Sequence, residues 1–392
     1  MKLIKTIVSW IWKIIKWGFL VIVLLAAISA VYNTTLPKTS EVTEVLSESQ
    51  KIYISEAFNL QHGLGNDLWP EWGTTKIPVI VYNEDYAFLI GYKNPPTGWH
   101  KMPSHEFRGV EWEKVENDDF FGSEYYRQLL PNKNITPENF TVKVGDTWVA
   151  TLQTKEYAAV MFYNDFRESL PPVISSIFPY RIFWNLVMGQ AEQYIAGLMH
   201  ESFHAFQGTI VPEKLAQGEL VTHISDQYPW HQQDNIDGWK KETSLLLKAY
   251  YNDNIDSVKH YTAEFLAERQ MRRQKAGITV EQIGYEKKRE WLEGLAKYAE
   301  LKILLLAEKD TDYQPVKETA GLSDFKKYKK SSKIFFRQLD EVKRAAGRTG
   351  ESRFYYVGML QAMVLDKIAP GWKTSVFGDD VFLDDLLILA IS

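Results

Sequence analysis

The chain has 392 residues, of which 45% are hydrophobic and 24% charged, so it can bury a large core and has the composition of a globular protein. Its 45 lysines and arginines stand against 50 aspartates and glutamates, which argues against nucleic acid as a partner. The absence of cysteine excludes disulfides, thiolate metal sites and cysteine catalysis.

The first predicted element is an N-terminal cytoplasmic tail and membrane anchor over residues 1–32. Lysines without any acidic residue precede an uncharged apolar run from Gly18 to Tyr32. With their apolar flank, residues 7–32 are long enough to cross a lipid bilayer. Because positive charge precedes the span, we expect a single-pass cell-membrane protein with a cytoplasmic N-terminus and an extracytoplasmic body. The alternatives are a cleaved signal peptide with secretion, and a buried core helix.

The next segment, residues 33–50, is polar and predicts a stalk, and residues 51–180 predict a β-rich α/β lobe. Two runs rich in β-branched and aromatic residues, 76–83 and 86–92, are typical of paired strands.

Alternation of apolar and polar residues marks the end of this lobe. The run at 140–154 alternates on both sides of Gly145, which predicts a hairpin. The run at 156–164, EYAAVMFYN, predicts a further strand.

From about Trp184 the pattern is helical, and residues 181–392 predict a mainly helical lobe. We expect one long helix from Trp184 to Gly208 and a long loop over 209–236. Capping residues and apolar spacing predict further helices after Asp237 and Asp256, and over 285–309, 331–347, 353–370 and 381–390. The predicted fold class is therefore α+β, with an N-terminal transmembrane helix, a β-rich lobe that flanks a cleft, and a helical lobe.

The segment 198–207, LMHESFHAFQ, contains the pattern His-Glu-x-x-His on the predicted long helix. Residues four apart share a helix face, so His200 and His204 can present two imidazoles to one metal ion. Glu201 is displaced around the helix, where it can reach a zinc-activated water without ligating the metal. The alternative is a chance spacing of two histidines on a buried helix.

A catalytic zinc ion, Zn²⁺, needs a third protein ligand. The segment 293–300, EGLAKYAE, resembles the Glu-Gly-x-Ala-x-Tyr-x-Glu pattern of the aminopeptidase-type gluzincins, which are zinc metallopeptidases. This resemblance implies that Glu293 ligates zinc, and the small Gly294 and Ala296 should let its helix approach the His-Glu-x-x-His helix. Glu300 lies two turns on and can orient a histidine. The alternative is that these glutamates form a solvated helix face.

The same resemblance implies a tyrosine that stands three residues before a glycine and donates a hydrogen bond to the oxyanion. Tyr355 stands three residues before Gly358, and its neighbour Tyr356 is the second choice. A tyrosine donor stabilises a tetrahedral intermediate without competing for the metal. The alternative is that both rings belong to the core.

The sequence departs from the gluzincin pattern in three ways. The gap between His204 and Glu293 is wider, and Lys297 stands where thermolysin-like enzymes have aspartate. The strand motif Gly-x-Met-Glu-Asn, which binds the substrate's amino terminus, has its nearest counterpart at 159–164, where the glutamate is missing. As a strand, that stretch could still pair with an extended substrate.

These patterns predict a membrane-anchored, zinc-dependent peptidase with a zincin-like catalytic lobe, which hydrolyses a peptide or protein substrate and contacts the lipid bilayer through residues 7–32. The alternative is a catalytically silent zincin-fold binding module in the cell envelope, and a scaffold without metal is a third. The loop residues His223, His231 and Asp234 could line the cleft or bind a second ion, and the alternative is that they form turns and polar surface. The basic run at 326–333 is a solvated helix start or a contact for lipid head groups.

Overall fold

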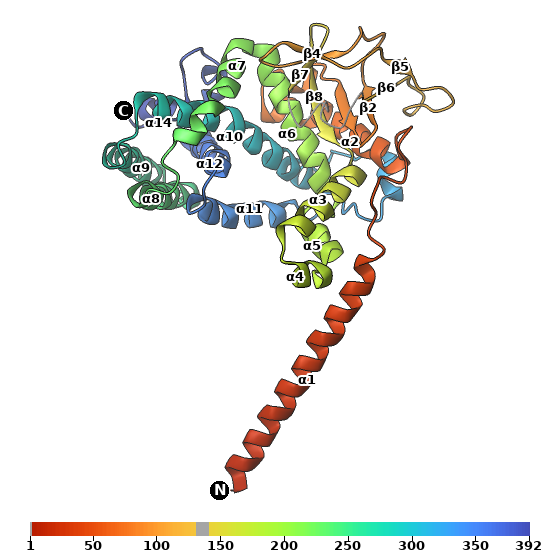
Figure 1. Cartoon of the computed structure of the whole chain (residues 1–392). Coiled ribbons are helices and arrows are strands. Elements are labelled where there is room, and N and C mark those ends of the chain that lie inside the picture. The colour runs from red at the N-terminus through yellow and green to blue at the C-terminus, as the bar shows by residue number, and fades with distance from the viewer. Residues whose placement is uncertain (1, 131–140) are drawn as a thin grey trace.

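The structure, a computed structural model, describes residues 2–130 and 141–392, with side chains from Trp10 onward. It is a mixed α/β fold in which one long helix stands out from a body built of a curled sheet and many helices (Figure 1). The predicted mixture of sheet and helices is therefore confirmed. Phe140, the first residue of the predicted hairpin, lies outside the described residues.

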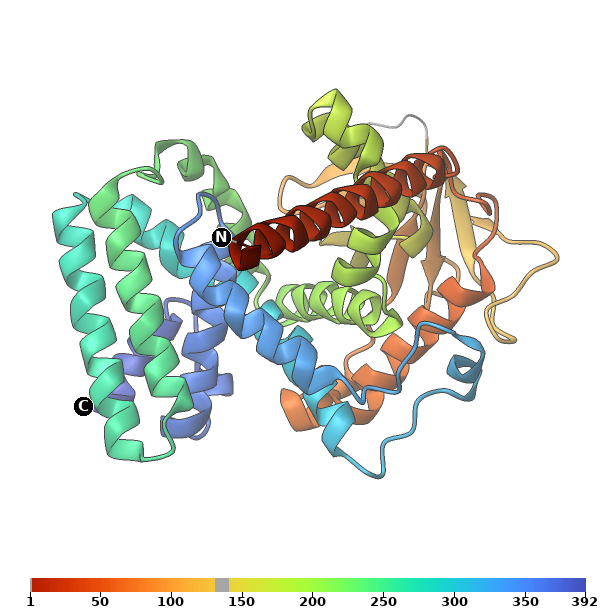
Figure 2. The same cartoon turned by 90° about the horizontal axis from the view of Figure 1, so that it is seen from below.

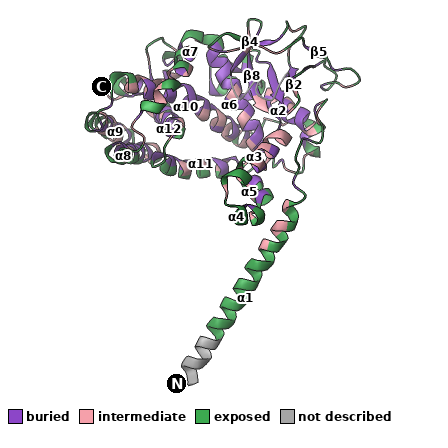
Figure 3. Cartoon of the chain, in the orientation of Figure 1, coloured by how far each residue is buried: buried purple, intermediate pink, exposed green. Residues whose placement is uncertain are grey.

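The long helix α1 (Lys2–Asn33) projects away from the body. Its segment Trp10–Asn33 has a mean hydropathy of 2.5, and none of residues 10–33 is buried (Figure 3). A helix of 24 residues is about 36 Å long, and a bilayer's hydrocarbon core is about 30 Å thick. The segment is therefore long and apolar enough for a membrane span or a signal sequence, and it is not a buried core helix.

Residues 34–47 have neither helix nor strand, but they contact the body. Leu36 and Leu46 are buried, and the Ser40 hydroxyl donates to the Glu84 carboxylate at 2.7 Å. Helix α2 (Glu48–Leu68) then begins inside the segment predicted as a stalk. This helix was not predicted, although its Ser47 side chain accepts a hydrogen bond from the backbone as an N-cap does.

Eight short strands form one sheet in the order β4-β3-β7-β8-β1-β2-β6-β5. They are β1 (Val79–Tyr82), β2 (Tyr86–Ile90), β3 (Trp99–Lys101), β4 (Glu106–Arg108), β5 (Glu113–Lys114), β6 (Tyr126–Leu129), β7 (Val142–Val144) and β8 (Thr147–Gln153). Strands β1 and β2 pair antiparallel with Val79 opposite Ile90, and β7 and β8 form a hairpin, so both predicted pairings are confirmed. Strands β1 and β8 run parallel.

The predicted strand at 156–164 is wrong, because this segment lies inside helix α3 (Lys155–Ser169). The Thr154 hydroxyl caps the helix by accepting a hydrogen bond from the Tyr157 amide. Its two buried side chains, Val160 and Tyr163, are three residues apart, which is helical spacing. Residues 159–164 therefore cannot pair with an extended substrate as a strand.

The rest of the chain is helical: α4 (Pro172–Ile177), α5 (Tyr180–Val187), α6 (Ala191–Ile210), α7 (Pro212–Leu220), α8 (Gln233–Tyr251), α9 (Ile255–Lys275), α10 (Val280–Lys309), α11 (Ser331–Ala346), α12 (Ser352–Ile368), α13 (Trp372–Ser375) and α14 (Leu383–Ile391). Short 3-10 helices lie at Trp72–Thr74, Val221–Gln227 and Lys317–Gly321.

The predicted caps of α8 and α9 are wrong, because Asp237 and Asp256 lie inside these helices. Helix α8 begins at Gln233, and the Asn254 side chain caps α9 by accepting from the Ser257 amide.

Two further helix predictions need correction. The long helix expected from Trp184 to Gly208 is divided, because Gln190 starts α6 with a capping box that it shares with Gln193. The expected loop over 209–236 contains helix α7, which begins at Pro212, and the 3-10 helix that follows it. The predicted helices near residues 331–347, 353–370 and 381–390 are confirmed as α11, α12 and α14.

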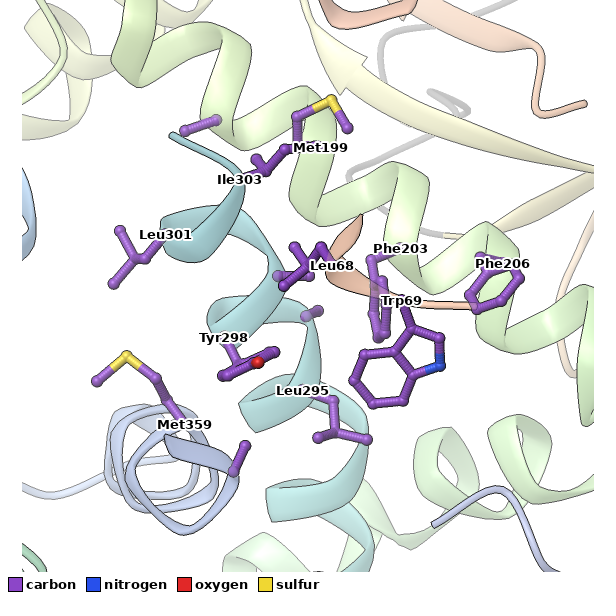
Figure 4. Close-up of a cluster of buried hydrophobic side chains, with 14 of the residues drawn as sticks. Leu68, Trp69, Met199, Phe203, Phe206, Leu295, Tyr298, Leu301, Ile303 and Met359 are labelled. Carbon is purple, nitrogen blue, oxygen red and sulfur yellow. The ribbon is translucent and has the colours of Figure 1, made fainter. Parts of the chain in front are cut away.

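The main core lies where α2, α6, α10 and α12 meet, and Figure 4 shows part of it. Phe203 of α6 packs edge-on against Trp69 and Trp72, with ring centroids 5.0 and 5.2 Å away. On its other side α6 lies so close to β8 that a Cβ on Gly208 would come within 2.6 Å of the Trp148 ring. Helix α6 is therefore held on two sides.

Helices α10 and α12 cross at a pair of glycines. A Cβ on Gly294 would lie 2.4 Å from the Gly358 Cα atom, and a Cβ on Gly358 would lie 2.3 Å from the Glu290 carbonyl oxygen. The expectation that Gly294 serves the approach to the His-Glu-x-x-His helix is therefore wrong. The crossing brings α12, which carries Tyr355, close to α10, which carries Glu293.

A buried network of charges joins α8, α9 and α10. Arg272 of α9 pairs with Glu242 of α8, and its Nη1 atom donates to Glu286 of α10 at 2.7 Å. Arg269 pairs with Glu290 of α10 at 2.6 Å. All five side chains are buried, so each charge depends on its partners rather than on water.

Candidate metal centre

Three side chains from α6 and α10 bring their ligand atoms together in the interior. His200 and His204 lie one turn apart on α6, and their Nε2 atoms are 3.1 Å apart. The Oε2 atom of Glu293 lies 3.4 Å from the first nitrogen and 3.3 Å from the second. All three residues are buried, and together they can hold a metal ion.

The other nitrogen of each imidazole is held by an acceptor. The Nδ1 atom of His200 lies 3.1 Å from the Glu300 carboxylate, and that of His204 lies 2.9 Å from the Gln207 side-chain oxygen. Lys297 donates to Glu300 at 2.7 Å and keeps it in place. Protonation at Nδ1 in both rings leaves both Nε2 lone pairs directed at the same point, as a metal site requires.

The geometry of the three atoms fits an ion between them. Two ligands held about 2.0–2.1 Å from a tetrahedral ion are about 3.3 Å apart, close to the separations found here. The Oε2 atom of Glu293 is buried and has no hydrogen-bond partner among the described residues. A buried carboxylate oxygen without a partner is costly, and a cation removes that cost.

Arg289 holds the other carboxylate oxygen of Glu293. Its Nη2 atom donates to Oε1 of Glu293 at 2.6 Å and to Glu351 at 2.8 Å, and its Nη1 atom reaches Glu219 at 3.3 Å. Burial opposes a charge on Glu293, but a protonated His204 and the guanidinium of Arg289 outweigh it and hold the pKa of this carboxyl well below its usual value. Glu293 therefore stays an anion with one oxygen free for a ligand.

The carboxyl of Glu201 lies beside the group without belonging to it. Burial raises its pKa to about 6, although the imidazoles of His200 and His204 act in the opposite direction. Glu293 and Glu219 also raise this pKa, because their negative charges oppose a charge on Glu201. A partly exposed carboxyl at this position can exchange a proton with a molecule in the site.

The two candidate tyrosines lie in different surroundings. The ring of Tyr355 is parallel to that of His200 within 7°, with centroids 5.9 Å apart. Burial and the charge of Glu293 raise the pKa of its phenol, which therefore remains a donor at neutral pH. Tyr356 donates instead to Gln338 of α11 at 2.8 Å. The geometry favours Tyr355 as the residue of the site.

Several residues that support the site were not predicted. Gln207 lies three residues after His204 and Arg289 four residues before Glu293, so helical spacing could have indicated both. Glu219 and Glu351 come from other elements, and only the folded chain brings them to Arg289. The side chains of His223, His231 and Asp234 are exposed. Among the described residues, only His200, His204 and Glu293 bring three possible metal ligands close enough together to share one ion.

Comparison of the chain with protein-family models, with curated proteins and with solved structures gives no significant match. Only the residues and their geometry therefore indicate a function.

Proposed function

We propose that the chain is a zinc-dependent peptidase of the gluzincin type, anchored in the cell membrane by α1 with its body outside the cytoplasm. The observation that carries this proposal is the triangle of ligand atoms from His200, His204 and Glu293, with the Glu201 carboxyl beside it. Two nitrogen ligands and one carboxylate oxygen form a donor set that suits zinc and leaves one coordination position open.

A zinc ion bound by these ligands would lower the pKa of a water molecule and polarise a carbonyl oxygen. Two side chains of the protein supply proton transfer and stabilisation of the oxyanion. Glu201 accepts the proton of the attacking water and later passes it to the leaving amine. Tyr355 donates its phenol proton in a hydrogen bond to the oxyanion of the tetrahedral intermediate.

The net charge of the surroundings supports a cation at this place. The carboxylates of Glu219, Glu293 and Glu351 pair with Arg289, and that of Glu300 pairs with Lys297. The charges of Glu293 and Glu219 also act on the Glu201 carboxyl. A divalent ion reduces the repulsion among these carboxylates, whereas an apolar ligand would leave it in place. The carboxylate excess also agrees with a site built for metal rather than for an anion.

The membrane part of the proposal is supported by α1. Lysines precede its apolar segment and no acidic residue lies in the first 32 positions, so the sequence favours a cytoplasmic N-terminus. The apolar length suffices for a span. A body outside the cytoplasm also agrees with a chain that contains no cysteine.

Turnover of a peptide library by the full chain in detergent, read by mass spectrometry, tests the proposal. We expect cleavage that is lost on chelation and restored by zinc, and that falls by about 10²–10⁴-fold in E201Q. The variant E213Q, which changes an exposed glutamate on α7, is the control and should match the wild type. Full activity in E201Q would refute the mechanism, and zinc binding without any turnover would favour the binding module.

A further inference from the structure

Two short helices beside α1 expose many apolar side chains. Within residues 173–187 the exposed large aliphatic residues, with their exposed fractions, are Val173 (76%), Ile174 (48%), Ile177 (38%), Ile182 (63%), Leu186 (58%) and Val187 (44%). Outside α1, no other stretch of this length in the described chain exposes as many. A cluster of this size on the surface indicates an interaction site.

The inner face of the same helices is already used for folding. Tyr180 and Trp184 of α5 are buried against Tyr163 of α3 and the linker residue Leu36, with Phe178 packed at the edge. Helix α5 is therefore apolar on two faces. The inner face is covered by α3 and the linker, whereas the outer face needs a separate partner.

The position of this outer face is fixed relative to α1. The side-chain amide of Asn33, the last residue of α1, donates to the carbonyl oxygens of Ser176 and Phe178, both at 2.9 Å. Arg181 of α5 donates to the Thr35 carbonyl oxygen at 2.7 Å. The turn between α4 and α5 therefore lies level with the end of the apolar segment, as Figure 1 shows.

Basic side chains lie on the same side of the body. The exposed residues Lys330, Lys333 and Arg337 belong to α11 or precede its first turn, and Phe336 between them is 56% exposed. The Arg337 guanidinium reaches the Leu186 carbonyl oxygen at 3.5 Å, which ties α11 to α5. Figure 2, viewed from the side on which α1 leaves the body, shows α11 on this face. Apolar and basic residues together are typical of a membrane interface.

We propose that the outer face of α4 and α5 inserts into the surface of the bilayer that α1 spans, so that lipid is its occupant. This inference rests on the anchor in the proposed function and adds a second membrane contact to it. With a single span, the helix and the body could tilt together in the bilayer, whereas a second contact fixes the orientation of the body. Three residues separate α5 from α6, and His200 lies about 14 Å along the axis of α6, so the second contact sets the height of the metal centre above the bilayer.

Single cysteines test this contact, because the natural chain contains none. The full-length variants V173C and L186C carry an environment-sensitive nitrobenzoxadiazole dye and are reconstituted into vesicles of phosphatidylcholine and phosphatidylglycerol. F107C is the matched control, since Phe107 is 54% exposed on β4, on the far side of the body from α1. L24C in α1 reports on the anchor itself. Each dye is exposed to a nitroxide lipid and to iodide in the water.

We expect the nitroxide lipid to quench the dye at positions 173, 186 and 24, and iodide to quench it at position 107. If the dye at position 24 is in lipid while those at 173 and 186 are quenched by iodide, the second contact is refuted and the anchor stands. If the dye at position 24 is itself in water, the anchor fails. Dyes at 173 and 186 that neither agent reaches would show contact with a second copy, which also overturns the inference.

Discussion

At the scale of single residues, the candidate metal centre depends on which nitrogen of each imidazole faces inward. Glu300 and Gln207 accept from the Nδ1 atoms of His200 and His204, which directs both Nε2 atoms to Glu293. These acceptors are as much a part of the site as the ligands, because a ring free to rotate presents its lone pair only part of the time.

The first prediction concerns Glu300. Replacing it in E300L removes the acceptor for His200, so the affinity for zinc should fall by about 10–100-fold in a competition titration with a chromophoric chelator. In E300Q an amide oxygen remains to accept the hydrogen bond, and the loss should be smaller. Equal affinity in the wild type and E300L would mean that Glu300 does not orient the ligand.

The second prediction separates the two tyrosines. Y355F should lower kcat by about 10²–10³-fold while zinc affinity is unchanged, because the lost donor acts on the oxyanion. Y356F loses its hydrogen bond to Gln338 and should keep wild-type turnover, with a stability cost of about 1 kcal/mol. Steady-state kinetics on both variants would test this, and a larger loss of kcat in Y356F would assign the hydrogen bond to the oxyanion to Tyr356 instead.

Much of the candidate site can be predicted from the sequence, because its residues fall at helical spacings. The interval of four between His200 and His204 puts them on one face whatever the rest of the fold does. Glu293 could be proposed only through a family resemblance, since nothing in the sequence reveals that α10 crosses α6. For the same reason Glu219 and Glu351 could not be found: they meet at Arg289 only after folding.

At the scale of elements, the close crossing of α10 and α12 sets where Tyr355 lies. We predict that G294A destabilises the fold by about 1–3 kcal/mol, because its Cβ would lie 2.4 Å from the Gly358 Cα atom. Gly284 on the same helix is the control, since a Cβ there would meet no described atom within 4 Å. G284A should stabilise the protein by about 0.5–1 kcal/mol. Chemical denaturation of both variants gives the comparison, and equal effects would contradict it.

A further prediction concerns the buried charges between α9 and α10. Burial opposes the charge on Glu286, but Arg272 and Arg273 outweigh it and lower the pKa of its carboxyl far below the usual value. In E286Q the arginines lose that partner, and unfolding free energy at pH 7 should fall by about 3–5 kcal/mol.

The stability difference between the wild type and E286Q should depend on pH, in a direction set by the lowered pKa of Glu286. Because the folded-state pKa is depressed, the stabilisation is complete above the unfolded value, about 4.5, and is lost as the pH falls below it. Urea denaturation of the wild type and E286Q should therefore give curves that converge below pH 4.5. A difference that stays constant down to pH 3 would mean that Glu286 is not the titrating group.

The elements that the sequence misassigned show what limits such predictions. The run at 156–164 has high β propensity, yet Thr154 caps a helix there and tertiary packing of Val160 and Tyr163 decides in its favour. Helix α2 was not recognised because two of its charged residues, Lys51 and Glu56, are buried in polar contacts rather than placed on a solvent face. The two hairpins and the helices α11, α12 and α14, whose patterns agree with their burial, were predicted correctly.

At the scale of the whole molecule, we propose that α1 and the pair α4 and α5 form the face toward the membrane, with the body above it. The full chain should remain with membranes after an alkaline carbonate wash, because an apolar segment of 24 residues inserts almost irreversibly. Release into the supernatant, together with loss of the apolar segment from the N-terminus, would identify a cleaved signal peptide instead.

The most direct measurement of the central claim is the metal content of the detergent-purified full chain by mass spectrometry, after reconstitution and removal of loose metal. The wild type and E201Q should each hold about one zinc ion per chain, because Glu201 is not a ligand. H204A and E293A should hold far less, because each loses one of the three atoms that meet within 3.4 Å. No zinc in the wild type, or full zinc in H204A and E293A, would contradict the metal centre and the peptidase with it.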